Sequence, residues 1–409
     1  MKEGKLYIGI STEKEILERT NNGGVITSLL KFALESKMVD IIVAVRQGRS
    51  RYESVLSFVT EPQEVKACAG SLHFGTPGIA KNIKKYLDTH NKKIAVVCKS
   101  CDARALIELA KIGQVNIDNI IMIGVNCTGT LAPAVTIDMI RKSGVDPYTL
   151  IYEDIDDDKL TFKFAQQAEK TFELSELEQN GLGRRNNCQR CEYPIPRMAD
   201  LACGKWGLNG EKETFIELCS TKGEELFGKA VSEGIIKVRT PTEQQIKLRE
   251  QEETRKIESA KKRQVEQFRD CDRDKSYWTS QLQACIKCYS CRDVCPLCHC
   301  KRCVLERDIP ETVQKGIIPP PLTFSMIRVL HVACYCVNCG QCEDVCSADI
   351  SLSLLTHYLN KHATKIFDYE AGTNVRDRLP LSAIPESERS NPSTELGTAE
   401  MQVDIEALG

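Results

Sequence analysis

Two runs of cysteine in the C-terminal part of the chain have the spacing of iron–sulfur ligands. In each run three cysteines stand three positions apart, and a fourth follows four positions later. The runs are Cys285, Cys288, Cys291 and Cys295, followed by Pro296, and Cys336, Cys339, Cys342 and Cys346. Three thiolates at this spacing can hold one face of a 4Fe-4S cluster, so the sequence predicts two such clusters.

The spacing also predicts how the ligands are shared. In bacterial-type two-cluster ferredoxins the fourth cysteine of each run binds the other cluster. This predicts one cluster on Cys285, Cys288, Cys291 and Cys346, and the other on Cys336, Cys339, Cys342 and Cys295. Zinc is the alternative, because it is also bound by Cys-x-x-Cys pairs, but zinc sites seldom use eight thiolates in two runs of four. Ser347 stands where a second proline would complete the pattern.

Further cysteines lie in the N-terminal half, where predicted strands end. Cys98 and Cys101 bracket the turn after one strand, Cys127 ends the next, and Cys188 and Cys191 form another spaced pair. Ligand sites in open α/β sheets gather at strand ends, and paired cysteines recur where metals bind. Free cysteine is also a common buried core residue. That role is the favoured one for Cys68, Cys203, Cys219 and Cys271.

Four further cysteines form a second group, and their spacing does not indicate a role. A further metal site and shielding of the nearer cluster are both open for it. Its members are Cys298, Cys300, Cys303 and Cys334.

Small-residue loops offer places where backbone amides can approach a cofactor. Asn22-Gly23-Gly24 opens a predicted helix, whose N-terminus can bind a phosphate, although this tripeptide is also a common turn. Residues 69–71 and 76–78 form two more such loops. The chain contains no G-x-G-x-x-G dinucleotide fingerprint.

The composition is that of a globular protein of two or three domains. The 409 residues are 42% hydrophobic and 27% charged, and the net charge of −2 gives no argument for a nucleic-acid or membrane partner. No apolar run approaches the ~20 residues of a membrane-spanning helix, and the start lacks the apolar core of a signal peptide. We therefore expect a cytoplasmic protein, in which 21 cysteines serve as metal ligands or redox groups rather than disulfides.

The elements that would position these residues alternate between strands and helices over residues 1–145. Apolar strands between amphipathic helices predict an α/β sheet covered by helices. The predicted strands are 6–10, 40–45, 54–59, 94–98 and 120–126, and the predicted helices are 25–36, 77–87, 103–112 and 134–142. Beyond them we expect a strand at 160–164, a helix at 173–179 and a strand–helix–strand unit at 215–219, 223–232 and 235–238.

Composition divides the chain into four parts. Residues 1–240 form the α/β domain, and 241–279 a charged helical linker, either a solvated connector or a partner-docking helix. Residues 280–365 form a helical two-cluster module, in which 317–321 should be extended. Residues 366–409 form an extended or disordered tail that can also lie against a partner.

Several stretches together resemble the deazaflavin-coenzyme (F420) hydrogenase/dehydrogenase beta-subunit family, and most closely the formate dehydrogenase beta subunits of methanogenic archaea. The resemblance covers about residues 1–365, and its motifs are individually loose but jointly specific. They are residues 22–27, 69–71, 101–106, 124–127, Cys188-x-x-Cys191, 199–201 and Gly204-x-x-Gly207, with the two C-terminal cysteine runs as a separate match.

The resemblance implies the cofactors and their ligands. It implies an FAD in the first domain and coenzyme F420, an 8-hydroxy-5-deazaflavin, as hydride carrier. The implied FAD contacts are Gly23, Gly24, Thr27, Ser71 and Asn126. A third 4Fe-4S cluster is implied on Cys101, Cys127, Cys188 and Cys191, where Cys98 can replace or compete with Cys101.

The function implied is that of an electron-transfer flavoprotein subunit. A partner alpha subunit with a molybdenum or tungsten pterin would oxidise formate, because this chain has no motif for that chemistry. A hydrogenase or another dehydrogenase as partner, and a non-catalytic polyferredoxin adaptor without flavin, are the alternatives. Docking to a larger redox complex, such as heterodisulfide reductase, is compatible with the first function.

Overall fold

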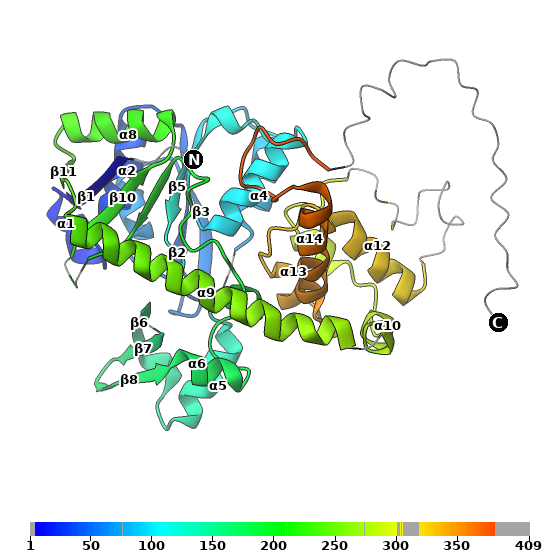
Figure 1. Ribbon diagram of the computed structural model, residues 1–409. Coiled ribbons are helices and arrows are strands. Elements are labelled where there is room, and N and C mark those ends of the chain that lie inside the picture. Colours follow the sequence, from blue (N-terminus) through cyan, green and yellow to red (C-terminus); the bar gives the residue numbers. More distant parts are fainter. Residues whose placement is uncertain are drawn as a thin grey trace, which may run out of the picture.

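The computed structural model describes residues 5–75, 77–156, 158–208, 210, 212–273, 275–300, 303, 305 and 319–380. They form one large mixed sheet with helices on both faces, a small separate sheet, and a helical C-terminal region; the long helix α9 (Glu243–Arg273) runs alongside all three parts (Figure 1). In the described residues no helix is long and apolar enough to cross a membrane.

The large sheet has the strand order β11-β1-β10-β9-β5-β4-β2-β3. The central strands β2 (Ile41–Gln47), β4 (Ile94–Cys98), β5 (Ile120–Val125) and β9 (Leu201–Gly204) are parallel. The flanking strands are antiparallel: β3 (Ser54–Val59) on one edge, and β10 (Thr214–Leu218), β1 (Lys5–Ser11) and β11 (Ile236–Arg239) on the other. Parallel strands need both faces covered, and their near-continuous Ile, Val and Ala runs are buried accordingly.

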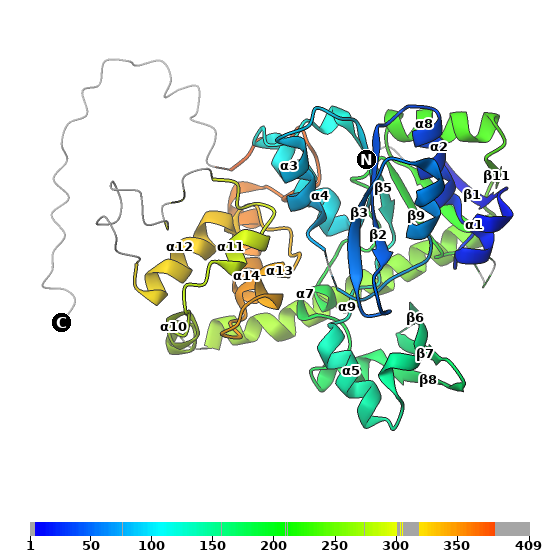
Figure 2. The same ribbon diagram turned by 180° about the vertical axis from the view of Figure 1, so that it is seen from behind.

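The two faces of the sheet are covered by different helices. On one face α2 (Val25–Glu35) and α8 (Thr221–Ser232) pack against alternate strand residues such as Ile42 and Ile123. On the other face α3 (Ile79–Leu87) and α4 (Ser100–Lys111) pack against the intervening residues, such as Val43 and Met122. The predicted α/β domain, with its strands at 54–59 and 94–98, is confirmed at this level. Figure 2 shows α3 and α4 from behind.

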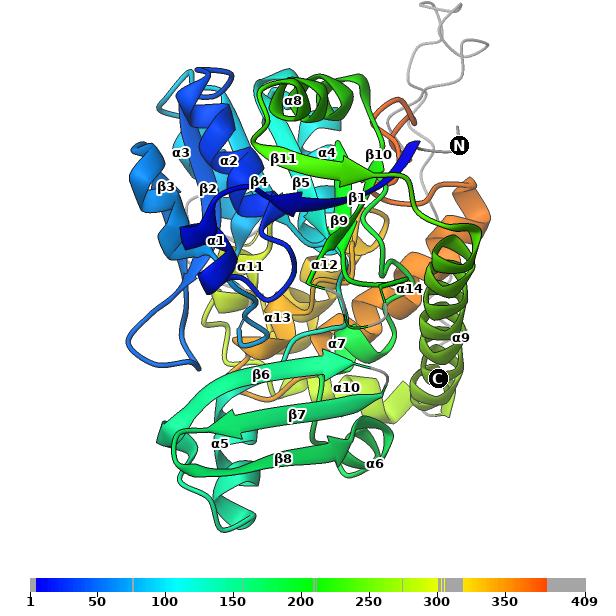
Figure 3. The same ribbon diagram turned by 90° about the vertical axis from the view of Figure 1, so that its left-hand side faces the viewer.

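A small sheet forms a separate layer beside the large one. It consists of β6 (Leu150–Asp156), β7 (Lys159–Phe164) and β8 (Gln167–Glu173), with α5 (Pro133–Lys142) and α6 (Leu174–Gln179) (Figure 3). The sequence predicted α5 as a continuation of the large α/β unit, and this is wrong. Met139 and Ile140 of α5 are buried with Leu160 and Phe162 of the small sheet instead.

The charged segment after the large sheet is a helix, as predicted, but it is more than a solvated connector. One side of the 31-residue α9 is buried at Arg249, Ala260 and Gln264. Arg249 Nη2 donates to Glu217 Oε2 of β10 at 2.6 Å, and Gln264 Nε2 donates to the Arg190 carbonyl at 3.1 Å. The helix is therefore attached to the large sheet and to the segment around Arg190 through buried polar contacts.

The C-terminal region is helical, with α10 (Lys275–Gln283), α11 (Ser290–Val294), α12 (Pro321–Ala333), α13 (Gln341–Asp344) and α14 (Leu352–Phe367). The extended segment predicted at 317–321 falls partly outside the described residues, and Pro321 begins a helix because proline suits the first helical position.

The tail is not extended throughout. Tyr369 and Ala371 are buried against α4, where Tyr369 donates its hydroxyl proton to Glu108 at 2.6 Å. Residues 381–409 lie outside the described ones. The boundaries between the four predicted parts of the chain stay predictions.

Candidate metal centres and cofactor cavity

The two C-terminal cysteine runs lie around two cavities. The first cysteine cavity is lined by Cys285, Cys288, Cys291 and Cys346. The second cysteine cavity is lined by Cys336, Cys339, Cys342 and Cys295, and Cys291 also touches it. Each cavity thus receives the fourth cysteine of the other run, the arrangement that the spacing predicted; the assignment of these thiols as ligands stays a prediction. Among the described residues no three Cys, His, Asp or Glu side chains converge as the ligands of a single ion do.

The loops of the two runs share one backbone conformation. Lys287 and Tyr289 follow the first cysteine by two and four positions and have φ of 57° and 64°; Asn338 and Gly340 occupy the same places in the second run, with φ of 54° and 73°. These left-handed residues turn the backbone around the sulfurs. The N–H groups of Lys287 and Asn338 each donate to the first sulfur of their run at 3.4 Å. The loops are therefore shaped to stabilise negative charge on sulfur.

Arg328 of α12 lines both cysteine cavities from inside the C-terminal region. Its side chain is 5% exposed, and its Nη2 donates to the Cys291 carbonyl at 3.1 Å, while its Nε and Nη1 have no hydrogen-bond partner. Burial opposes the charge of Arg328, but the nearby Cys295 and Cys298 thiols outweigh it and raise the pKa of the guanidinium. An anionic group in these cavities would pair with this cation, so the residues present fit thiolate-bound iron–sulfur clusters.

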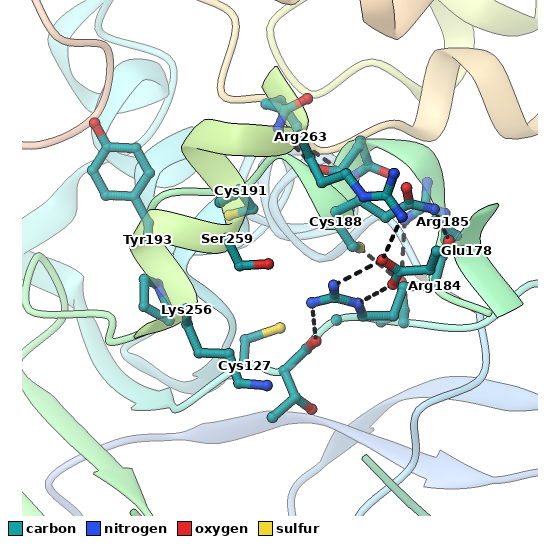
Figure 4. Close-up of a pocket in the computed structure, with 18 of the residues that line it drawn as sticks. Cys127, Glu178, Arg184, Arg185, Cys188, Cys191, Tyr193, Lys256, Ser259 and Arg263 are labelled. Carbon is teal, nitrogen blue, oxygen red and sulfur yellow. Dashed lines mark hydrogen bonds and ion pairs between the residues drawn. The ribbon is translucent and has the colours of Figure 1, made fainter. Parts of the chain in front are cut away.

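A third cysteine-lined cavity, here the α9 cavity, lies between α4, α7 (Asn186–Gln189) and α9. Its volume is about 310 Å³, and Cys101, Cys127, Cys188 and Cys191 all line it. Figure 4 shows Cys127, Cys188 and Cys191 pointing into it. Burial raises the pKa of Cys127 to about 12 and that of Cys191 above its usual range. These thiols would therefore need a bound metal to become thiolates at neutral pH.

Cys98 does not reach the α9 cavity. Its thiol is buried, lies 3.9 Å from the Ile123 carbonyl oxygen, and lines a different cavity. Cys101 stands on the first turn of α4 and faces the other three cysteines. The structure therefore favours Cys101 over Cys98 as the fourth member of that group.

The second large cavity, here the strand-end cavity, lies where β2, β4, β5 and β9 end. Its volume is about 260 Å³. Four of the five residues predicted to contact FAD line it, namely Gly24, Thr27, Ser71 and Asn126. Gly23 is not among the lining residues. A Cβ on Gly23 would come within 2.9 Å of the backbone of Glu213 and Thr214, so this glycine permits a close backbone contact.

Buried polar atoms without partners point to a polar ligand in the strand-end cavity. Thr20 Oγ1, His73 Nδ1 and both amide atoms of Asn126 are buried and have no hydrogen-bond partner, and all three residues line this cavity. Because buried polar groups are normally hydrogen-bonded, these atoms fit the rings and hydroxyls of a bound cofactor. Sequence reasoning missed Thr20 and His73, which stand in loops without a motif.

One wall separates the α9 cavity from the strand-end cavity. Its residues line both cavities and are Lys99, Cys127, Thr128, Gly129 and Thr130. Lys99 Nζ lies 2.7 Å from Asp102 Oδ2. Burial opposes the charge of Lys99, but Asp102 and Cys101 outweigh it and raise the pKa of the lysine. A fixed positive charge thus lies between the four cysteines and the strand-end cavity.

Arginine and lysine side chains from α9 and the 184–185 turn surround the α9 cavity. Arg184 pairs with Glu178 at 2.5 Å, and Arg263 approaches the same carboxylate at 3.8 Å. Lys256 points toward Cys127 in Figure 4, and burial together with the neighbouring Arg184 lowers the pKa of its ammonium. The composition of α9 gave no sign of this placement, because its charges read as a solvent-exposed face.

The structure is a mixed α/β fold with cysteine-lined cavities, and comparison with known proteins assigns the chain to one family. Residues 6–81 and 91–244 match the N-terminal and C-terminal models of the coenzyme F420 hydrogenase/dehydrogenase beta subunit. The chain belongs to this family.

Several relatives can be compared along their whole length. The chain is 44% identical over 377 residues to the F420-dependent formate dehydrogenase subunit beta of Methanocaldococcus jannaschii, covering 90% of this chain and 96% of that one. It is 39% identical over 386 residues to the F420-dependent formate dehydrogenase 1 subunit beta of Methanococcus maripaludis, covering 92% and 97%.

A solved structure shares the fold. A chain of the F420-reducing [NiFe] hydrogenase complex from Methanosarcina barkeri superposes with a TM-score of 0.58 at 17% identity, covering 65% of this chain and 92% of that one. At this identity the likeness concerns the fold alone.

Proposed function

We propose that the chain is the electron-transfer beta subunit of an F420-dependent formate dehydrogenase. The observation that carries the proposal is the near-full-length similarity to two formate dehydrogenase beta subunits, which extends over the C-terminal cysteine runs. The match to the coenzyme F420 hydrogenase subunit beta of Methanococcus voltae covers only 56% of this chain, at 22% identity. The hydrogenase alternative therefore has less support.

The cavities suit three 4Fe-4S clusters and one FAD. The two cysteine cavities and the α9 cavity are each lined by at least four cysteines, and the strand-end cavity is lined by residues with unpaired polar atoms. When bound, the clusters would transfer electrons singly and the FAD would exchange electron pairs with F420 as hydride.

The chain's own residues would hold and insulate these groups. The loops at 285–289 and 336–340 present N–H groups to sulfur, and Arg328 balances negative charge between the two cysteine cavities. Residues 127–130 line both the α9 cavity and the strand-end cavity, so groups bound in the two cavities would lie close to each other. Lys99 would provide a buried positive charge between the α9 cavity and the strand-end cavity.

A partner must supply the oxidation of formate. We propose a molybdenum- or tungsten-pterin alpha subunit for this role, because the cavities described here suit electron carriers. A polyferredoxin adaptor would have no use for the strand-end cavity, which argues against a chain that carries clusters only.

The test is to purify the protein with its partner under anaerobic conditions and count cofactors. We expect about twelve irons, matching sulfide and one FAD per chain, and bleaching of the flavin by reduced F420. Zinc in place of iron, or a preparation without flavin, would contradict the proposal. Nickel instead of molybdenum or tungsten in the partner would favour the hydrogenase alternative.

A further inference from the structure

His73 is held firmly at the edge of the strand-end cavity. Its backbone N–H donates to Glu153 Oε1 at 3.0 Å, and its carbonyl oxygen accepts from the Leu131 N–H at 2.7 Å. Its side chain lines the cavity, and its buried Nδ1 has no hydrogen-bond partner. The backbone is thus fixed on both sides, and the Nδ1 edge of the ring lies 3.7 Å from Glu153 Oε1.

His73 is hydrogen-bonded next to the residues that the two cavities share. Leu131, to which His73 is bonded, directly follows Thr130, and Thr130 belongs to the wall shared with the α9 cavity. Electrons that leave a cluster held by Cys127 would enter the strand-end cavity through this wall. A flavin that accepts them would have to lie near this wall, and His73 is bonded to the segment beside it.

Charged and titratable neighbours surround the imidazole on its outer side. Glu153 of β6 is fully buried, lies 3.7 Å from His73 Nδ1, and pairs with Arg51. Arg51 also donates from Nη2 to the Ser71 carbonyl at 2.6 Å. Tyr52, from the same turn, donates to the Pro147 carbonyl, and burial raises its pKa. Glu153 can stabilise a protonated imidazole, and Arg51 keeps that carboxylate in place.

The other ionisable side chains that line the described part of this cavity are poorly suited to give up a proton near neutral pH. Lys99 and Lys205 are paired with Asp102 and Asp154, each at 2.7 Å, and these partners keep both lysines charged against the effect of burial. Burial raises the pKa of the four lining thiols, those of Cys68, Cys98, Cys127 and Cys203. Histidine, by contrast, ordinarily exchanges its proton between about pH 5 and 8.

We propose that His73 is the proton donor of the strand-end cavity, an inference that rests on the proposed function. Formate oxidation by the partner releases carbon dioxide, one proton and two electrons. His73 gives one proton for each electron pair that enters: the N–H bond of its protonated imidazole breaks, and a new N–H bond forms on the flavin ring. Water then restores the proton to His73. In the reverse direction the same imidazole accepts it.

The test compares the complete complex carrying wild-type chain, His73→Gln or His90→Gln. His90 is an exposed histidine stacked on Tyr86 and serves as the control. Flavin is counted first, so a chain without flavin counts against the proposed function and not against His73. Two quantities are then measured from about pH 6 to pH 9: the rate of flavin reduction by formate and the midpoint potential of the flavin.

We expect the wild-type rate to fall with an inflection as pH rises across the measured range. His73→Gln should be about a hundredfold slower and lose that inflection, while His90→Gln keeps it. Because water restores the proton to His73, the flavin potential should show the same proton uptake per electron pair in wild type and in His73→Gln, so that only the rate differs. Identical rate profiles in wild type and His73→Gln would overturn the proposal. If His73→Gln binds no flavin, His73→Asn replaces it, and a rate of flavin reduction in His73→Asn equal to that of wild type overturns the proposal.

Discussion

Cys98 and Cys101 stand three positions apart in the sequence, yet their side chains line different cavities. The chain leaves β4 at Cys98 and begins α4 at Ser100, so the strand-to-helix turn at Lys99 sends the two thiols in different directions. Spacing alone cannot distinguish them, because the choice depends on where the strand ends.

Replacing each of these cysteines by alanine tests whether Cys101, and not Cys98, is a cluster ligand. We expect Cys101→Ala to lose about four of twelve irons and the electron paramagnetic resonance signal of one cluster. Cys98→Ala should keep all of its iron, because its thiol faces the strand-end cavity. Loss of iron in Cys98→Ala alone would show that the ligand has been assigned to the wrong cysteine.

His357 of α14 should make the C-terminal region sensitive to acid. Burial, with Arg190 and Lys361 nearby, holds the pKa of this imidazole well below its usual range. The unfolded chain therefore binds the proton first as pH falls, and the stability of the fold is lost downward from the unfolded pKa of about 6.5. For one proton this loss approaches about 1.4 kcal/mol per pH unit.

The measurement is the thermal midpoint of the complex from about pH 7.5 to 5.5. His357→Gln should show a flatter dependence than wild type. His362→Gln, on the exposed side of the same helix, should behave like wild type. An unchanged slope in His357→Gln would mean that other groups cause the acid sensitivity.

At the scale of elements, α9 does more than its composition suggests. Arg249 and Glu217 form a buried pair between α9 and β10, and both side chains are less than 10% exposed. Arg197 Nε donates to the same carboxylate at 2.8 Å and contacts Glu253 of α9 as well. The helix is thus attached to the edge of the large sheet by a small ionic network.

Arg249→Ala should destabilise the protein by about 3 kcal/mol, because it removes one partner of a buried ion pair. Lys261→Ala, at an exposed position of the same helix, is the matched control. Thermal midpoints of the two variants measure the effect. Equal midpoints would show that water replaces the arginine without cost.

Whether the sequence predicts an element correctly depends on how regular the apolar pattern of its residues is. The strand at 94–98 is an unbroken apolar run, so its ends could be predicted correctly. β9 has four residues and ends in Gly204, while β6 carries Glu153 and Asp154, so neither has a strong apolar pattern. The cysteine groups could be predicted from their spacing. The places of His73 and Lys99 at a cavity could not, because they depend on how loops distant in sequence pack together.

At the scale of the whole molecule, the segment after α14 packs back against a helix of the large α/β sheet. After α14, residues 369–372 pack on α4, where Glu108 is 1% exposed and accepts from the Tyr369 hydroxyl and the Gly372 N–H, each at 2.6 Å. The C-terminal region and the large sheet also share one hydrophobic core, in which Leu297 and Val337 lie with Ile79 and Leu106.

Two truncations test whether residues 369–372 stabilise the fold. Ending the chain after Pro380 should leave the thermal midpoint unchanged. Ending it after Phe367 should lower the midpoint, because Glu108 then keeps Lys111 but loses both contacts from residues 369–372. If both truncations melt alike, the segment contributes little to the fold.

The exchange of fourth cysteines between the two runs has a consequence for biosynthesis. The first cysteine cavity takes Cys346 from a position beyond α12, so it is not closed until the ribosome has passed that residue. A metal inserted on the first run alone would sit on three thiols in an open loop. If each cavity holds a metal centre as proposed, its cysteines would be complete only after Cys346 for the first cavity and after Cys342 for the second, and loss of one run would remove a ligand from both.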